Sequence, residues 1–434
     1  MGSDTGDFDA GRTGMGPAAA LPRRPDEASR FPFLVFLTLA IAAAHVLARV
    51  SAICTSANYD SLTYAVAAWQ FYSPDALAAD LVADKPAGQA LLTGWCYRLW
   101  PGSPSRLALV PIESAFLLAG YAAFWHLARR LHGSRVASLQ LAMLVLAFNA
   151  YNTLDDSTAG FNVNENYLLL PALVAVLAHL AMPDRRRRAL VRGLGLGLAL
   201  SVKQTAVGLL VALLVHGAIR AWRSGRRREA VWSAAWTGAG LLLAVSPLVV
   251  VLAARNWLAP HLYGLACLSG GHLQPPRLGL PPWIRVVPLV PIAWWLLVGA
   301  AARWGEGSAD RSEQTDSSPE ITGHSDAGSF LWIWLTMEVA VLTMLNRHSA
   351  HYYQPLVVPA ALLTGTGLAW VVRSARSLPP VQRARVVHWS VLITLALAMP
   401  AVMSFAVEIQ RRWVGYDITR EAGEFARRLA DGSP

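Results

Sequence analysis

Long apolar segments separated by short polar ones divide this sequence, and that pattern decides which class of protein it can be. A helix needs roughly 20 apolar residues to cross the hydrocarbon core of a bilayer. Because lipid offers the backbone no hydrogen-bond partner, segments of this kind cross it as helices. The sequence therefore predicts an all-α fold, a polytopic transmembrane helical bundle with about eleven spans. The predicted segments are 32–53, 107–128, 136–151, 166–182, 190–202, 205–220, 232–254, 284–302, 330–346, 354–372 and 388–408.

The charge content supports the membrane class and argues against a soluble domain. Only 15% of the residues are charged, whereas a soluble globular domain has nearer a quarter. The net charge of +10 would favour nucleic-acid binding in a soluble protein. Here the arginines stand between apolar segments, so they indicate membrane topology instead, and no nucleic-acid partner is expected.

The basic loops predict the orientation of the chain. Arginines follow the second, fourth, sixth and tenth apolar segments, and these loops fall on one side if eleven spans alternate. Basic loops stay in the cytoplasm, so the N-terminus is expected inside and the C-terminus outside. The arginines of these four loops are Arg129, Arg130 and Arg135, then Arg185 to Arg188 and Arg192, then Arg220, Arg223 and Arg226 to Arg228, then Arg373, Arg376, Arg383 and Arg385.

The polar segments suggest how the chain is organised. Residues 1–31 are expected to form a disordered cytoplasmic tail, and 32–408 the transmembrane catalytic domain. Within that domain, 54–106 is a first outer loop with amphipathic helices at the membrane interface, and 303–329 is a flexible cytoplasmic linker. Residues 409–434 would be a short extracytoplasmic tail. The fifth and sixth apolar segments meet at Lys203-Gln204, as one long helix or as two.

Three ionisable residues of the first outer loop are candidates for chemistry. Asp60 could cap the short helix that follows it, or it could be a general base at the membrane surface. Asp84 and Lys85 could form a solvated ion pair of little energetic value. Of the 37 basic residues, however, only Lys85 and Lys203 are lysines. Because the chain uses arginine at its other basic positions, the two lysines indicate that a compact ammonium charge is needed there.

Further candidates lie at the other outer turns. Glu165 begins the fourth segment, where it could stabilise a helix N-terminus. Lys203 stands between two apolar segments, where an ionisable group is costly and indicates function. The turn Arg347-His348-Ser349-Ala350-His351-Tyr352-Tyr353-Gln354-Pro355 could hold a phosphate or form an interfacial anchor. Glu338, in the middle of the ninth segment, could relay protons, or it could be a buried carboxyl group that is kept neutral or bonded to a neighbouring helix. Cys54 and Cys96 fall on the outer side and could pair.

These motifs resemble, in type and order, those of the polytopic GT-C glycosyltransferases. The similarity is greatest to protein O-mannosyltransferases and the aminoarabinose transferase of lipid A. The shared features are Asp60 followed by Tyr64, then Asp84-Lys85-Pro86, then Glu165 at the start of the fourth span, then a Gly-rich segment ending in Lys203-Gln204, then His351-Tyr352-Tyr353-Gln354-Pro355.

The resemblance implies transfer of a sugar, with inversion, from a polyprenyl-phosphate donor to an extracytoplasmic lipid, glycan or protein. Asp60 would be the base, and Asp84 and Glu165 would orient the sugar or acceptor, or bind a divalent cation, the one cofactor implied. The donor phosphate would be held by Lys203, Arg347, His351 and Tyr353, with Lys85 assisting. The expected location is the cell (inner) membrane. Two alternatives stay open, a transporter or lipid flippase, and a non-catalytic member of an envelope-polysaccharide pathway.

Overall fold

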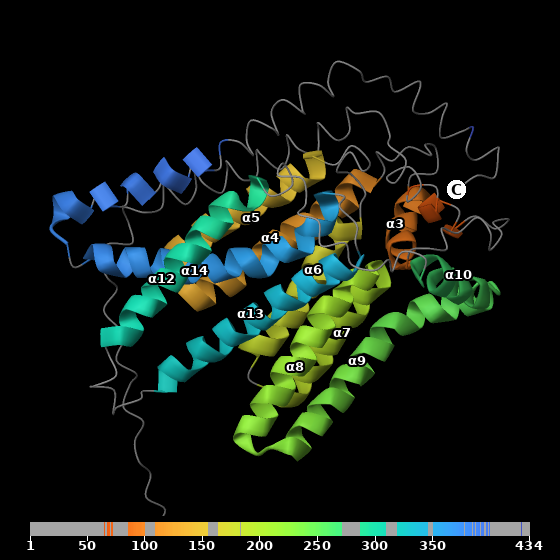
Figure 1. The fold of residues 1–434 in the computed structure, drawn as a ribbon. Coiled ribbons are helices and arrows are strands. Elements are labelled where there is room, and N and C mark those ends of the chain that lie inside the picture. Colours follow the sequence, from red (N-terminus) through yellow and green to blue (C-terminus); the bar gives the residue numbers. More distant parts are fainter. Residues whose placement is uncertain are drawn as a thin grey trace, which may run out of the picture.

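The computed structural model describes residues 86–99, 109–154, 164–182, 184–270, 287–309, 319–345 and 350–376, parts of 65–72 and 378–399, and residue 427. These residues form helices and no strand, which confirms the all-α class for the described part (Figure 1). The α-helices are α3 (Gly88–Leu99), α4 (Val110–His132), α5 (Ser134–Leu154), α6 (Asn164–Ala181), α7 (Arg185–Val202), α8 (Val207–Ser224), α9 (Arg227–Ala254), α10 (Leu258–Gly270), α12 (Val290–Ala309), α13 (Pro319–Leu345) and α14 (Gln354–Arg376). Short 3₁₀ turns are η4 (Gln204–Ala206), η5 (Val287–Leu289) and η6 (Ala350–Tyr353).

The helices α4 to α9 and α12 to α14 overlap nine of the predicted segments. Five stretches of the described chain are long and apolar enough to cross a membrane, so the protein is a membrane protein. The total of about eleven spans stays a prediction. The five stretches are Asn164–Ala181, Gln204–Ser224, Arg227–Ala254, Asp326–Met344 and Gln354–Ala375.

The bundle has two ends, which are named here by one residue each. The Glu165 end contains the start of α6, the end of α7 and the turn η6. The His179 end contains the end of α6, the start of α7 and the connection between α8 and α9. Fourteen residues of helix α6 separate Glu165 from His179, which at 1.5 Å per residue is roughly 21 Å.

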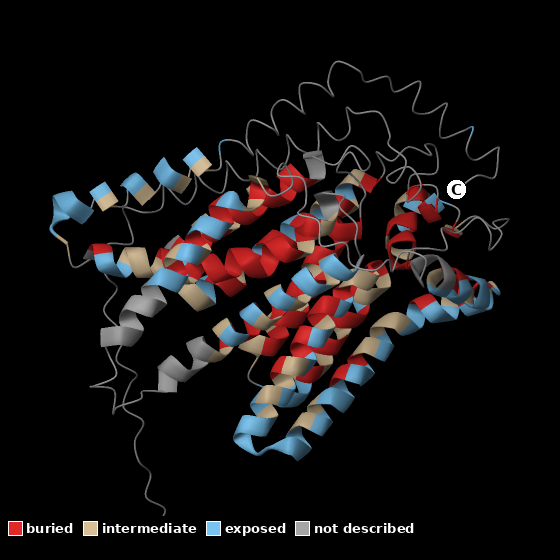
Figure 2. Cartoon of the chain, in the orientation of Figure 1, coloured by how far each residue is buried: buried red, intermediate tan, exposed pale blue. Residues whose placement is uncertain are grey.

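The core lies where α6 and α14 pass through the bundle, and α9 lies at its edge (Figure 2). Most of the α6 span is buried, as is most of α14, whereas α9 exposes most of its apolar side chains. A soluble protein would not expose such a surface. In a bilayer the exposed face of α9 contacts lipid, which costs nothing because lipid is as apolar as the side chains.

Helix α7 begins and ends at polar residues. Asp184 caps its first turn by accepting hydrogen bonds from the backbone N–H groups of Arg186 and Arg187, at 2.9 and 3.0 Å. The bond from Arg187 holds the pKa of the exposed Asp184 carboxyl below its ordinary value. The helix ends at Lys203, whose backbone is extended with φ −151° and ψ 132°. The fifth and sixth predicted segments are therefore two helices, α7 and α8.

Glycines let α7 pack in backbone contact with its neighbours. A Cβ atom on Gly193 would overlap the carbonyl oxygen of Thr237 in α9, and one on Gly240 of α9 would overlap that of Leu190. On another face, a Cβ on Gly195 would lie 2.7 Å from the carbonyl oxygen of Pro171 in α6. Helix α7 is therefore held between α6 and α9, and it lies beside them in Figure 1.

The segment predicted as the first outer loop contributes helix α3, which packs near the Glu165 end. Tyr72 donates a hydrogen bond of 2.8 Å to the carbonyl of Leu91 in α3. Cys96 in α3 is a free thiol, so it forms no disulfide with Cys54. Whether α3 lies along the membrane interface stays a prediction. Further along the sequence, the end of α12 and the start of α13 lie within the predicted linker 303–329.

Candidate functional site

Glu165 and Lys203 form a buried ion pair at the Glu165 end. Glu165 lies in the first turn of α6, and Lys203 is the residue at which α7 ends. Their side chains are only 3% and 8% exposed. Charges withdrawn from water to this degree are stable only when paired. Two residues predicted separately from the sequence are thus brought together by the packing of α6 against α7.

The turn η6 places an aromatic ring over this pair. The Lys203 Nζ atom lies 4.4 Å from the centre of the Tyr352 ring, which is a cation–π contact. Tyr353, one of the residues predicted to bind the donor phosphate, lies buried and stacked on Tyr151, with ring centres 5.6 Å apart. Gln354 anchors the turn by donating a hydrogen bond of 3.0 Å to the carbonyl of Phe148.

A second buried carboxyl group lies near the start of α6. Glu113 of α4 is fully buried, and its Oε1 atom accepts a hydrogen bond of 2.5 Å from Asn166. Asn166 follows Glu165 directly in the chain, so Glu113 helps to fix the first turn of α6. Glu113 had not been identified as a candidate from the sequence, although it stands in a predicted span, where a carboxyl group indicates function.

Pro86, the last residue of the Asp84-Lys85-Pro86 motif, leads into helix α3, which contacts the end of α7. A Cβ atom on Gly88 would overlap the carbonyl oxygen of Ser201, so the two backbones are in contact. Ser201 precedes Lys203 by two residues, and Gly88 follows Lys85 by three. The chain therefore enters α3 beside the Glu165–Lys203 pair.

Four of the predicted site residues lie outside the described part of the chain. They are Asp60, Asp84, Lys85 and Arg347. The backbone of His351 belongs to η6, while its side chain is also outside the description. The described site therefore consists of Glu165, Lys203 and the two tyrosines of η6, Tyr352 and Tyr353.

No metal site is formed by the described residues alone. Within those ranges, no three His, Cys, Asp or Glu side chains gather closely enough to hold a metal ion. Glu165, the one described residue predicted as a metal ligand, is paired with Lys203. His261 of α10 is buried, and neither of its ring nitrogens has a hydrogen-bond partner among the described residues.

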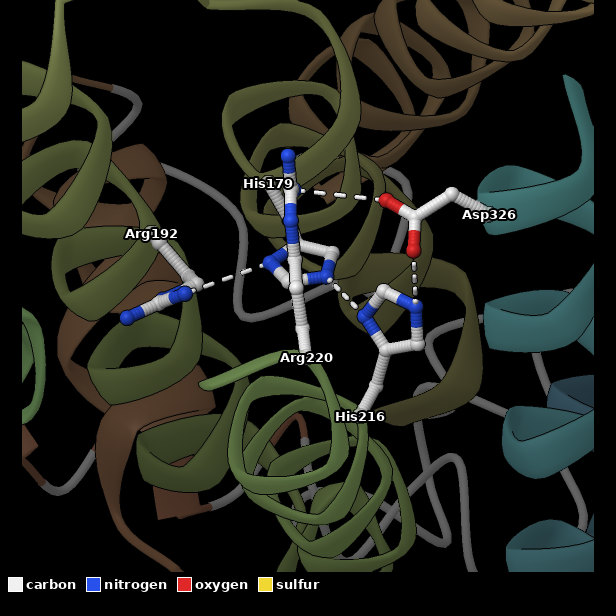
Figure 3. A network of polar contacts seen from close by, with 5 residues as sticks. All are labelled: His179, Arg192, His216, Arg220 and Asp326. Atoms are coloured by element: carbon white, nitrogen blue, oxygen red, sulfur yellow. Dashed lines mark hydrogen bonds and ion pairs between the residues drawn. The ribbon is translucent and has the colours of Figure 1, made fainter. Parts of the chain in front are cut away.

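A second polar network lies at the His179 end, and Figure 3 shows five of its residues. His179 Nε2 and His216 Nδ1 are 2.9 Å apart, and His216 Nε2 lies 3.1 Å from Asp326 Oδ1. Arg192 Nη1 lies 3.2 Å from His179 Nδ1. Arg220 pairs with the other carboxylate oxygen of Asp326 at 3.3 Å. These residues come from α6, α7, α8 and α13, and Arg192 also bonds to Thr237 and Ser233 of α9.

Sequence reasoning did not find the histidines of this network. A single His in an apolar helix is usually a satisfied core residue, and neither His179 nor His216 stands in a recognisable motif. A spacing signal did exist in α13, where Asp326, Phe330, Trp334 and Glu338 follow one another at intervals of four. Residues at that spacing share one face of a helix.

The fold is similar to those of two membrane transferases of known structure. One is the oligosaccharyltransferase AglB of Archaeoglobus fulgidus, in complex with an inhibitory peptide and a dolichol-phosphate, at 13% identity and a TM-score of 0.57. The alignment covers 86% of this chain and 56% of that one, so this chain spans little more than half of the oligosaccharyltransferase. The other is ArnT of Cupriavidus metallidurans bound to undecaprenyl phosphate, at 19% identity and a TM-score of 0.50.

The ArnT alignment covers 92% of this chain and 79% of ArnT. No protein-family model matches the sequence, and no curated protein matches it either. At these identities the likeness shows the fold alone, and it agrees with the resemblance that the motifs carry. The chain is thus a membrane protein with the fold of the GT-C glycosyltransferases.

Proposed function

We propose that this protein is a membrane glycosyltransferase that moves a sugar from a polyprenyl-phosphate donor to an extracytoplasmic acceptor, with inversion. The observation that carries the proposal is the buried Glu165–Lys203 pair beneath Tyr352, at one end of a GT-C fold. The two similar structures are bound to a dolichol-phosphate and to undecaprenyl phosphate. In this proposal the Glu165 end faces the outside of the cell membrane.

The chemistry of the transfer explains why a cation belongs there. Attack by an acceptor hydroxyl forms a new bond to the sugar and breaks the bond from the sugar to the phosphate oxygen. The hydroxyl proton passes to a base, and the departing lipid phosphate gains negative charge. Cationic donors that face this charge lower the barrier. Lys203 provides an ammonium group with three N–H donors for it.

The remaining roles follow from the motifs. Asp60 is the proposed base, and Asp84 and Glu165 orient the sugar or the acceptor. The contact of Gly88 with Ser201 supports a place for Asp84 and Lys85 beside Lys203. Arg347 precedes the turn η6 by three residues in the sequence, and His351 belongs to the turn. Because Tyr352 of the same turn lies over Lys203, the proposal assigns both residues to the donor phosphate. Tyr353 then acts indirectly, by holding η6 against Tyr151.

The test uses purified protein in lipid with a panel of polyprenyl-phosphate sugars. Release of polyprenyl phosphate is followed for the wild type, for Asp60→Asn and for Asp184→Asn. We expect one donor to be consumed, and Asp60→Asn to lose transfer by at least about 100-fold because no group accepts the hydroxyl proton. Asp184→Asn makes the same chemical change at the opposite end of the bundle and is expected to keep full activity.

Two outcomes would count against the proposal. Full activity in Asp60→Asn would remove Asp60 as the base. No release and no donor binding across the whole panel would favour the transporter or the non-catalytic partner. Adding a chelator to the same assay decides whether a divalent cation takes part.

A further inference from the structure

A small cavity inside the bundle connects the Glu165–Lys203 pair to a second buried acid, Glu338. The cavity gives the centre of a water molecule about 20 Å³ of free volume. A single water needs roughly 10–15 Å³ by this measure. Glu165 and Glu338 are the two carboxyl groups in its wall, and the remaining lining is apolar apart from the Trp334 indole. The lining residues are Phe148, Glu165, Leu168, Leu169, Ala172, Ala206, Leu209, Trp334, Glu338, Pro355 and Val358.

Glu338 of α13 is held in the interior of the bundle without a cation. The indole N–H of Trp334, one helical turn away, donates a hydrogen bond of 2.8 Å to its Oε1 atom. Among the described residues, no Lys, Arg or His forms an ion pair with Glu338. An isolated buried carboxylate is very costly, so the neutral carboxylic acid is the stable form here.

Glycine also shapes this position. A Cβ atom on Gly208 of α8 would lie 3.2 Å from the carboxyl atoms of Glu338, so α8 passes close to the acid, and a larger residue there would require the acid to shift by a few tenths of an ångström. The Glu338 carboxyl group is therefore confined between α8, Trp334 and the cavity. A neutral carboxylic acid has one O–H group that can donate a hydrogen bond. The ionised carboxylate of Glu165, which can accept one, lines the same cavity.

We propose that one water in this cavity bridges the neutral Glu338 acid to the Glu165 carboxylate, making Glu338 a positioning residue for Glu165 and Lys203. The Glu338 O–H donates to the water, and the water donates to Glu165. The carboxylate of Glu165 is then held from one side by this water and from the other by Lys203. This inference rests on the proposed function, since it assigns Glu338 a part in orienting the cation that meets the donor phosphate.

The test compares Glu338→Gln, which keeps a neutral hydrogen-bond donor, with Glu338→Met, which has similar length and no donor. The first readout is the reactivity of Lys203 toward a small amine-acylating reagent. The chain has two lysines, so Lys85→Arg leaves Lys203 as the sole lysine, and peptide mass spectrometry follows its acylation. We expect Glu338→Met to raise the rate about fivefold or more, and Glu338→Gln to change it less than twofold.

The second readout is sugar transfer in the same variants. We expect Glu338→Met to lower kcat about tenfold with KM for the donor nearly unchanged, because a misplaced Lys203 stabilises the transition state less well. Glu338→Gln is expected to keep kcat within about twofold. If Glu338→Met does not fold, Gly208→Ala replaces it. That variant keeps every polar group, presses on the Glu338 carboxyl group, and is expected to raise Lys203 acylation.

The outcomes separate this inference from the proposed function. Equal Lys203 acylation rates in the wild type, Glu338→Gln and Glu338→Met would overturn the water bridge. Loss of kcat in Glu338→Gln to the level of Glu338→Met would overturn it too, because proton transfer by Glu338 would then be required. A wild type that releases no lipid phosphate would overturn the proposed function, while the acylation rates would still decide the inference.

Discussion

The two ends of the bundle both bury charged side chains, but they hold them differently. At the Glu165 end, the pair is made by residues at helix termini. At the His179 end, the charges lie within helices and their contacts join five of them (Figure 3). We propose that the first arrangement presents a charge to the donor phosphate, whereas the second joins helices together.

The hydrogen bonds at the His179 end run in one direction. Arginine can only donate, so His179 Nδ1 accepts from Arg192, and His179 Nε2 must carry the proton. That N–H donates to His216 Nδ1, and His216 Nε2 then donates to Asp326. Both histidines are neutral in this assignment, and each of their four ring nitrogens has a partner. A second N–H proton on either ring would set two N–H groups against each other, so the network suits a structural role better than proton transfer.

The largest expected effect comes from breaking the pair at the Glu165 end. Lys203→Met leaves the Glu165 carboxylate buried without its cation, which costs about 3–5 kcal/mol of folding free energy. Transfer is expected to fall at least about 100-fold, because the leaving phosphate loses a cation. Unfolding in denaturant and release of lipid phosphate measure the two losses. The double variant Glu165→Leu/Lys203→Met should recover most of the stability and none of the activity. Recovery of both would make this end structural as well.

Arg192→Met tests the opposite assignment at the His179 end. It removes the guanidinium group that bonds to His179, Thr237 and Ser233, and is expected to cost about 2–3 kcal/mol of folding free energy. The transfer rate of the folded protein should stay within about twofold of the wild type. Arg192→Lys keeps the charge but not the planar fork of donors, and should recover less than half of the lost stability. A large fall in kcat of Arg192→Met at unchanged stability would contradict the structural role of the His179 end.

A smaller effect is expected from the backbone contact between α7 and α9 near Arg192. In Gly240→Ala the new methyl group overlaps the Leu190 carbonyl, and overpacking of this kind costs about 1–3 kcal/mol. Gly238→Ala is the matched control, because nothing lies within 4 Å of a Cβ atom at that position. At position 238, alanine forms a helix more readily than glycine, so Gly238→Ala should leave the stability unchanged or raise it by up to about 1 kcal/mol. Thermal unfolding of the two variants in the same lipid gives the difference, and equal midpoints would contradict the close contact.

Much of the fold could be predicted because a membrane helix is encoded locally. Apolar length predicts nine of the described α-helices, whereas α3 and α10 lie outside the predicted apolar segments. Asp184 and the break at Lys203 are visible in the sequence near the helix ends. Lys203 was identified by its rarity and its position, and Glu165 by its place at a span start. Their partnership was not predictable, because they lie 38 residues apart and meet only through the packing of α6 on α7.

The side-chain contacts of the site depend on turn geometry and helix packing, which the sequence does not reveal. Tyr352 and Tyr353 are adjacent in the chain, and the turn η6 alone decides that Tyr352 lies over Lys203 and Tyr353 over Tyr151. The hydrogen bond from Trp334 to Glu338 could have been predicted, because it joins residues four apart in one helix. The His179–His216 contact spans 37 residues and two helices, and neither residue stands in a motif that would mark it.

The glycines of α7 also bear on the order in which the protein assembles. Glycine is about 1 kcal/mol less favourable than alanine in a helix interior, and Gly193, Gly195 and Gly197 follow one another at alternate positions. Alone, this segment is a poor helix, and α6 and α9 must already be in place to hold it. Lys203 reaches Glu165 only when α7 is complete. We therefore expect the two charges to pair late in folding, so that the proposed cationic site forms only once the surrounding bundle exists.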